Sequence, residues 1–148
     1  MKVKKSIEIN APPERIWPYL TDPEKIMQWC ITFRDFRYTS DQHAGVGTPV
    51  FIEEKAAGPV MQMDFSVVEW TENEVVVLRK VSGNMPKNYE QRWHIEAQNG
   101  ESKFTFSEEI QLPWGFIGRL IESVGQGSSE KTVDDMLKIL KKLVEKES

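Results

Sequence analysis

An apolar stripe with helical spacing runs through the C-terminal part of this chain and limits the folds open to it. Apolar residues recur every three or four positions over residues 117–124 and again over 133–144, a period that predicts an amphipathic helix. If Pro113 to Glu147 forms mostly one helix, it is about 50 Å long. Since a ten-residue strand spans only about 33 Å, we expect the stripe to lie across several strands of a sheet.

Between the two halves of the stripe lie four small residues, Gly125, Gly127, Ser128 and Ser129. Glycines in a helix interior need a reason, because each costs about 1 kcal/mol relative to alanine. One explanation is a break, after which a second helix begins with Ser128 or Ser129 as its cap. The other is that the small side chains leave large residues of a facing sheet without partners, which leaves a cavity. The local sequence favours neither explanation.

Alternating segments separated by turn residues predict a sheet before the helix. The connections are too short for parallel neighbours, so the strands are expected to be antiparallel. Asn99-Gly100 is the clearest hairpin signal, because this pair readily takes the positive φ values of a type I′ turn. The apolar pair Val67-Val68 indicates a β-bulge that swaps the faces of one strand. The predicted strands cover residues 31–40, 48–56, 59–70, 74–82, 87–98 and 102–112.

The N-terminal residues predict a seventh strand that gives way to two short helices. Val3, Ile7 and Ile9 share one face of a segment with period 2. Pro12-Pro13 ends the strand, because proline donates no ladder hydrogen bond, and it suits the first turn of a helix. Asp22-Pro23 repeats this start signal, since aspartate is a good helix cap. We therefore expect two short helices between the first and second strands.

Period 2 also assigns inward faces to three of the strands. An inward Glu108 needs a partner, and Arg79 or Arg92 is a candidate. Alternatively Glu108 reaches water at a strand end, or a register slip places Glu109 inside instead. The residues expected to bind a ligand come from these faces and from the small-residue part of the helix: Met61, Met63, Phe65, Tyr89, Gln91, Trp93, Phe106, Glu108, Val124 and Ser128.

Composition and charge indicate one ordinary soluble domain over residues 1–148. The net charge of −4 offers no long-range attraction to nucleic acid or to an anionic membrane. No apolar run approaches the roughly 18 residues of a membrane helix, and no secretory leader opens the chain. The single Cys30 excludes an internal disulfide and fits a reducing compartment. We therefore expect a cytoplasmic protein without membrane insertion.

Recognisable catalytic and cofactor motifs are missing from the sequence. Two histidines and one cysteine do not make a convincing zinc site, and we find neither a nucleophile elbow nor a phosphate-cradling loop. We therefore expect no metal and no cofactor. Acidic residues are plentiful and most are expected at the surface, so no general acid or base can be singled out. The candidates are Glu53, Glu54, Asp64, Glu108 and Glu109.

The order strand, two short helices, six strands and long helix is similar to that of the START-like, or SRPBCC, helix-grip superfamily. The run Ile7–Asp22, with its Ala-Pro-x-Glu-x-Ile-Trp core, and the following Trp29 resemble the polyketide cyclase/dehydrase branch. Pro18 departs from the pattern and is expected to kink or shorten the first short helix. Further similar positions are Gly47-Thr48 at a strand start and, in the closing helix, Leu140, Leu143 and Glu145.

This resemblance implies an α+β helix-grip fold, in which a seven-stranded curved antiparallel sheet wraps around the long C-terminal helix. It also implies a deep, largely apolar cavity between sheet and helix. Relatives bind lipids, sterols, plant hormones or polyketides; some cyclise or dehydrate polyketides, and some activate a heat-shock chaperone. The shared motifs are packing and turn positions, so the resemblance assigns no residue a role.

Three functions are compatible with these observations. The first is binding or carriage of a small hydrophobic ligand, because an aromatic and methionine-rich inner face comes without a catalytic constellation. The alternative is a polyketide cyclase- or dehydratase-like enzyme that uses an inward carboxylate such as Glu108. The third is a protein-interaction or chaperone-activator module, which a large exposed apolar patch would favour.

Overall fold

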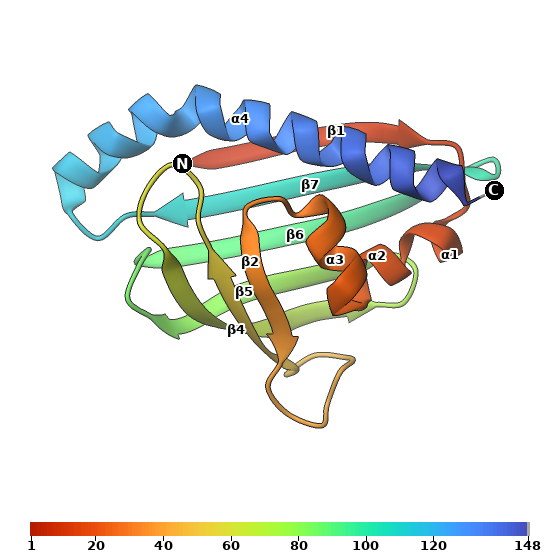
Figure 1. Cartoon of the computed structure of the whole chain (residues 1–148), viewed down its shortest axis with the longest axis horizontal. Helices are drawn as coiled ribbons and strands as arrows, with labels where there is room; N and C mark the ends of the chain where they lie inside the picture. Colours follow the sequence, from red (N-terminus) through yellow and green to blue (C-terminus); the bar gives the residue numbers. More distant parts are fainter. Residues whose placement is uncertain (148) are drawn as a thin grey trace.

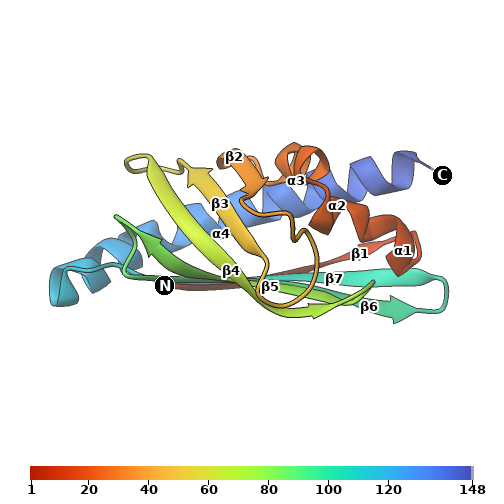
Figure 2. The ribbon, with the colours of Figure 1, turned by 90° about the horizontal axis from the view of Figure 1, so that it is seen from below.

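The computed structural model describes residues 1–147, and its strands form one seven-stranded antiparallel sheet in the order β1-β7-β6-β5-β4-β3-β2. The strands are β1 (Lys2–Ile9), β2 (Phe33–Tyr38), β3 (Pro49–Glu54), β4 (Met61–Thr71), β5 (Val75–Gly83), β6 (Asn88–Gln98) and β7 (Glu101–Gln111). The helices are α1 (Pro13–Ile16), α2 (Pro18–Thr21), α3 (Pro23–Trp29) and α4 (Gly115–Lys146). The sheet curls, so that β2 and β3 rise on the same side as α3 and α4 (Figure 2). The expected α+β helix-grip fold is confirmed.

The connection from β1 to β2 contains the two expected short helices, the first of them divided by Pro18. This proline ends α1 and begins α2, because its ring removes a backbone N–H from the helical ladder. The backbone of Trp17 stays helical, so α1 and α2 meet end to end. At α3 the Asp22 carboxylate accepts a hydrogen bond from the backbone N–H of Glu24 at 3.0 Å, as a helix cap does.

Two local features of the sheet follow from short sequence signals. The pairing of β4 with β5 shifts between Val67 and Glu69, so Val68 is the extra residue of the expected bulge. Asn99 and Gly100 have φ values of 51° and 85° and join β6 to β7 in a tight hairpin. Both predictions are confirmed.

Helix α4 is continuous through Gly125–Ser129, so the explanation that the helix breaks there is wrong. It lies nearest β1, β7 and α3, and it runs lengthwise along β1 and β7 (Figure 1). This corrects the expectation that the helix lies across several strands. The curvature of the sheet, rather than the direction of the helix, brings the more distant strands round to its apolar face.

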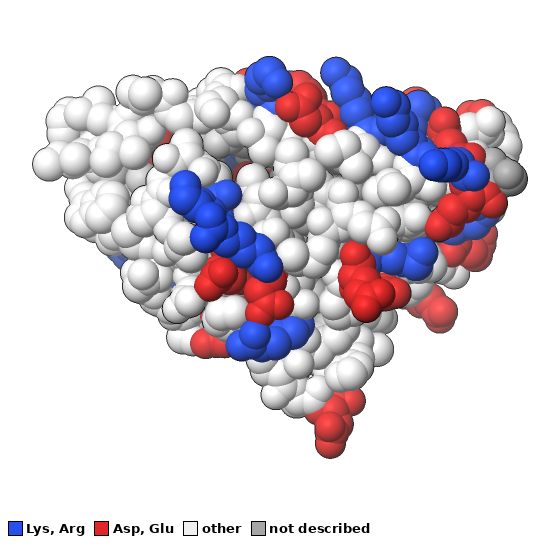
Figure 3. Space-filling view, viewed as in Figure 1, with Lys and Arg blue, Asp and Glu red and all other residues white. Residues whose placement is uncertain are grey.

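The two halves of α4 differ in burial. The C-terminal half is packed against the core through Val133, Met136, Leu137, Leu140 and Val144. The N-terminal half projects past the start of β1 (Figure 1), where Gln126 Nε2 donates to the Lys2 carbonyl at 2.7 Å. Its apolar side chains are therefore exposed, and this end of the molecule shows few charged groups (Figure 3). The exposed residues are Trp114, Phe116, Ile117, Leu120, Ile121 and Val124.

An aromatic cluster fills the core beneath the C-terminal half of α4. Trp29 has no solvent exposure and meets Trp93, Phe104 and Phe106 edge-to-face, with ring centroids 5.4, 5.6 and 6.2 Å away. Its indole N–H donates to the Tyr19 carbonyl at 2.8 Å, which satisfies the one polar atom of the side chain. The closely packed part of the core, beside the aromatic cluster, is therefore built from α3, β6 and β7.

Candidate functional site

A cavity of about 760 Å³ lies between the sheet and the N-terminal half of α4. This volume is within the range of small-molecule sites, about 300–1,000 Å³. The helix contributes Gly125, Ser128, Ser129 and Thr132 to its wall, and the connections 55–59 and 85–86 close other sides. Trp114 and Ile121 also line it and are 50% and 49% exposed, so they lie at its rim. Three of the four small residues of α4, Gly125, Ser128 and Ser129, thus face the cavity.

Most residues expected to bind a ligand line this cavity. They come from the inner faces of β4, β6 and β7 and from α4, as the period-2 and helical patterns predicted. A ligand contact by any of them remains a prediction. The lining residues are Met61, Tyr89, Gln91, Phe106, Glu108 and Ser128.

Four other expected residues lie outside the cavity wall. Met63, Phe65 and Trp93 are buried deeper in the core, where Phe65 meets the Tyr89 ring edge-to-face at 5.4 Å. Val124 is 87% exposed, because it lies about 100° around the helix from Gly125. The expectation that Val124 faces the sheet is therefore corrected.

Two further polar residues line the cavity: Glu54, which the sequence offered only as one of five possible acids or bases, and Thr32, which it did not single out. Most of those acids were expected at the surface, yet Glu54 is only 5% exposed. The signal was available in β3, where Val50, Ile52 and Glu54 alternate and all three are buried. Thr32 precedes β2, and no sequence pattern assigned it a face.

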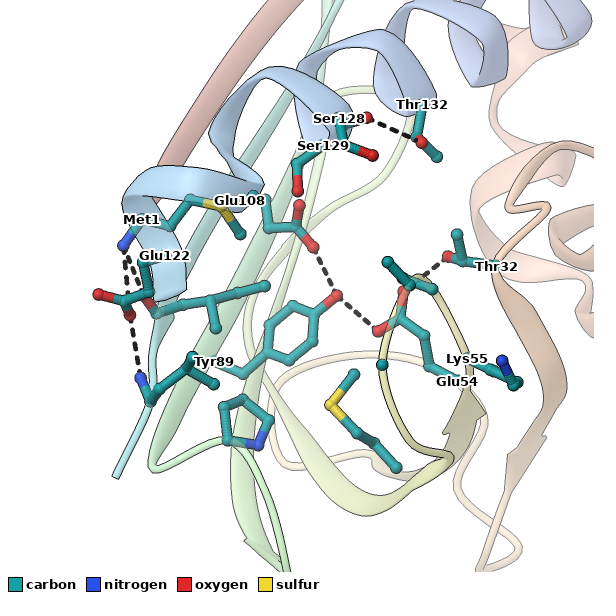
Figure 4. A pocket seen from close by; sticks show the side chains of 18 of the residues that line it. Met1, Thr32, Glu54, Lys55, Tyr89, Glu108, Glu122, Ser128, Ser129 and Thr132 are labelled. Carbon is teal, nitrogen blue, oxygen red and sulfur yellow. Dashed lines mark hydrogen bonds and ion pairs between the residues drawn. The ribbon is translucent and has the colours of Figure 1, made fainter. Parts of the chain in front are cut away.

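Glu54, Tyr89, Gln91 and Glu108 form one hydrogen-bonded cluster on the cavity wall. Figure 4 shows the Tyr89 hydroxyl between the carboxyl groups of Glu54 and Glu108. The Tyr89 hydroxyl lies 2.7 Å from Glu54 Oε1 and 2.6 Å from Glu108 Oε1. Gln91 Nε2 donates to the same hydroxyl at 2.7 Å. Thr32 donates to Glu54 Oε2 at 2.6 Å. Two acidic residues from β3 and β7 are thus connected through one tyrosine of β6.

The cluster shifts the ionisation of its members. Burial, with the nearby Glu54, raises the pKa of Glu108 to about 7, against the hydrogen bonds from Tyr89 and Gln91. Burial also raises the pKa of Glu54, and hydrogen bonds from Thr32 and Tyr89 oppose that rise. The pKa of Tyr89 is raised well above its ordinary value by burial and by the two carboxyl groups. Tyr89 therefore stays protonated near neutral pH.

The arginines expected as partners of Glu108 lie elsewhere. Arg79 Nε is 2.8 Å from Glu90, and Arg92 Nη1 is 2.7 Å from Glu69, in ion pairs whose side chains are all substantially exposed. The neighbouring Glu109 is exposed and pairs with Lys2, so the alternative in which it replaces Glu108 inside is wrong. Glu108 therefore has neutral partners in place of a cation.

Other functional groups are sparse around the site. The Met1 amino group lies 3.5 Å from Glu122, and Lys55 is exposed at the rim. Within residues 1–147, no set of three or more His, Cys, Asp or Glu side chains is arranged to hold a metal ion. None of the described helices has a stretch long and apolar enough to cross a bilayer. The site can therefore offer hydrogen bonds, a carboxyl proton and an apolar enclosure.

Comparison with known proteins gives the same fold. A structure of TTHA0849 from Thermus thermophilus is 19% identical, with a TM-score of 0.81 and coverage of 100% of this chain and 99% of that one. A START superfamily protein from Mycobacterium smegmatis is 17% identical, with a TM-score of 0.77 and 99% of both chains covered. The Zhui aromatase/cyclase from a Streptomyces species is 12% identical, with a TM-score of 0.74 and coverage of 98% and 93%.

Sequence comparison identifies the family. No curated protein matches the chain. The model of the family described as polyketide cyclase / dehydrase and lipid transport matches residues 1–145. The chain therefore belongs to the polyketide cyclase/dehydrase and lipid transport family, and its fold is that of the START-like superfamily.

Proposed function

We propose that the protein binds and carries a small, mainly apolar molecule in the cavity beneath α4. The observation that carries this proposal is the cavity of about 760 Å³ at the place where α4 presents Gly125, Ser128 and Ser129. Apolar side chains such as Met61 and Phe106 supply most of an enclosure suited to such a ligand. The polar cluster around Tyr89 supplies a few groups that can orient it.

Native mass spectrometry of the gently purified protein tests this proposal, together with titration with the uncharged fluorophore N-phenyl-1-naphthylamine. We expect either a co-purified small molecule or a saturable fluorescence increase with one site per chain. A bound natural ligand should lower the fluorophore uptake until it is extracted. A protein that carries no small molecule and takes up no fluorophore would contradict the proposal.

An enzyme of the cyclase or dehydratase kind is the second candidate. It is favoured by Glu108, whose pKa of about 7 suits a general acid or base near neutral pH. Glu108→Gln should then abolish turnover of a polyketide-like substrate while thermal unfolding shows an intact fold. Unchanged turnover would remove Glu108 from the mechanism.

A protein-interaction module is the third candidate. The exposed apolar residues of α4 are the kind of patch that it requires, for example Phe116 at 68% and Ile117 at 62% exposure. Nothing in the structure indicates which partner covers them. We therefore rank this function below the two that use the cavity.

A further inference from the structure

The donor and acceptor of each hydrogen bond around Tyr89 can be assigned, because one neighbouring group, the Trp93 indole N–H, can only donate. An indole N–H only donates, and Trp93 Nε1 lies 3.0 Å from Gln91 Oε1. That atom of Gln91 must therefore be the carbonyl oxygen, and the amide nitrogen faces Tyr89. Gln91 Nε2 donates to the Tyr89 hydroxyl at 2.7 Å. The hydroxyl thus accepts one bond, which leaves it one proton to donate and one lone pair.

Two carboxyl oxygens compete for the single proton of Tyr89. Glu54 Oε1 lies at 2.7 Å and Glu108 Oε1 at 2.6 Å from the hydroxyl oxygen. Tyr89 can donate to only one of them. The other contact is a hydrogen bond only if that carboxyl carries its own proton and donates it to the remaining lone pair. With both carboxyls ionised, one short oxygen–oxygen contact would have no hydrogen and would be repulsive.

The groups around Glu54 and Glu108 do little to stabilise a second negative charge on this pair. The state with one proton and a net charge of −1 is therefore favoured. Cys30 is buried beside it, and burial, Glu54 and Glu108 raise the pKa of its thiol, so it stays neutral. The Met1 amino group favours the ionised form of Glu108, but it is already paired with Glu122. Lys55 also lines the cavity, but it is exposed to solvent. From α4 the cavity is lined near the pair by the hydroxyl groups of Ser128, Ser129 and Thr132, and farther along by the Glu122 carboxylate, which is paired with the Met1 amino group (Figure 4).

We infer that Glu54 and Glu108 share one proton, and that the cavity therefore selects an apolar molecule bearing a hydrogen-bond donor, a hydroxyl or a protonated amine, over a carboxylate. The inference rests on the proposed function and narrows its ligand class. The shared proton lies in a contact with Tyr89 whichever carboxyl holds it. Glu108 Oε2 is then left as an acceptor that lines the cavity, without a hydrogen-bond partner in residues 1–147.

The ligand preference follows from this free acceptor. A ligand hydroxyl or ammonium group can donate to Glu108 Oε2 and complete the cluster. A ligand carboxylate at the same place would bring a second negative charge against the pair, in an enclosure where charges interact strongly. The chemistry of the wall thus distinguishes ligands that have the same apolar body.

Three probes with one alkyl chain test the preference: 1-decanol, decylamine and decanoate, each displacing N-phenyl-1-naphthylamine at pH 7. We expect decanol or decylamine to bind at least about tenfold more tightly than decanoate. Tighter binding of decylamine than of decanol would indicate a cationic ligand, and the reverse order a neutral one. Equal affinities for decanol, decylamine and decanoate would overturn the inference.

In Glu108→Gln the new amide N–H replaces the shared proton as a donor to Tyr89, so the single negative charge of the pair is confined to Glu54 and is no longer shared with the side chain at position 108. Decanoate affinity should therefore rise about fivefold or more, and decylamine affinity should fall. The matched control is Glu109→Gln, which removes an acid from the exposed face of the same strand. It should leave all three affinities unchanged. An equal rise in decanoate affinity in both variants would show an effect that does not depend on the Glu54–Glu108 pair and would contradict the inference.

Infrared spectroscopy provides a readout that needs no ligand. At pH 7 the wild-type protein should show the carbonyl band of a protonated carboxylic acid, and Glu54→Gln or Glu108→Gln should remove it. A wild-type spectrum without this band would overturn the shared proton. If the fluorophore and all three probes fail to bind while the band is present, the proposed function fails and the proton assignment stands.

Discussion

The hydroxyl of Tyr89 lies 2.6 Å from Glu108 Oε1, across the boundary between the adjacent strands β6 and β7. Glu108 is directly opposite Gln91 in the ladder and diagonal to Tyr89, so both side chains reach its carboxyl on one face. Each bond stabilises the ionised carboxyl and so opposes the rise of its pKa that burial and Glu54 cause. The ionisation of Glu108 is therefore set by two opposing groups of interactions.

Tyr89→Phe should raise the pKa of Glu108 above its present value of about 7, because it removes a bond to the ionised form. The pKa of Glu54 should rise as well, since Tyr89 also lowers that one. Carboxyl chemical shifts of ¹³C-labelled glutamate, followed over a pH titration, measure both. Tyr38→Phe removes a tyrosine hydroxyl that donates to the Thr21 carbonyl, away from the cluster, and should leave these titrations unchanged. A lower pKa for Glu108 in Tyr89→Phe would contradict the prediction.

The raised pKa of Glu108 makes stability depend on pH in a definite direction. The folded state holds its proton up to about pH 7, whereas an unfolded glutamate releases it near its ordinary value of 4.5. Between these values the folded state binds more protons, so the free energy of unfolding falls as pH rises. The stabilisation is complete below about pH 4.5 and is lost above about pH 7, with an upper limit of about 3 kcal/mol.

Glu108→Gln should therefore flatten the pH dependence. Urea unfolding at about pH 5 and pH 8 should show a smaller loss of stability in the variant than in the wild type, by about 1–3 kcal/mol. Glu109→Gln, on the outer face of β7, should follow the wild-type curve. If Glu108→Gln loses as much stability as the wild type between these pH values, the carboxyl is not the group that titrates.

Sequence periodicity could predict the fold and much of the site because both depend on strand faces. Tyr89, Gln91 and Glu108 were placed inward from alternation alone, and all three line the cavity. Alternation works here because successive side chains of a strand point to opposite faces. The same rule correctly placed the bulge at Val68, where two apolar residues occur in succession.

The predictions that failed concern how far a helix extends beyond the sheet and which strands the curl of the sheet brings together. Val124 belongs to a regular apolar stripe, but α4 projects beyond β1 at this point, so nothing covers it. Helical spacing gives the apolar face of a helix without giving the extent of the surface it packs on. Glu54 and Glu108 lie on β3 and β7, which are not neighbours in the sheet. Their link through Tyr89 depends on the curl of the sheet, which no local pattern specifies.

Replacing a tryptophan should lower the free energy of unfolding much more in the packed core than at the rim of the cavity. Trp29→Ala removes a fully buried side chain with three aromatic neighbours, and should lower the free energy of unfolding by about 3–5 kcal/mol. Trp114→Ala removes a side chain that is 50% exposed at the cavity rim, and should cost less than about 1 kcal/mol. Urea unfolding measures both. Fluorophore affinity should fall in Trp114→Ala, and similar stability losses in the two variants would contradict this division.

Gly125 and Gly127 offer a matched pair of substitutions that separates the helix from the cavity. At both positions an added Cβ would meet nothing within 4 Å, and both lie in the interior of α4. Leucine at either should therefore stabilise the helix by up to about 1 kcal/mol. Only Gly125 lines the cavity, so Gly125→Leu should also fill part of it and weaken fluorophore binding about tenfold or more.

Gly127→Leu should give the same rise in thermal stability with unchanged fluorophore affinity, because its side chain lies outside the cavity wall. Equal losses of affinity in the two variants would mean that binding depends on helix flexibility rather than on space beside Gly125. Unchanged affinity in both would place the bound molecule elsewhere. The opposite effects expected of Gly125→Leu, higher stability and weaker binding, would show that this helix keeps glycine at a cost in stability because the side chain of any other residue would enter the ligand's space.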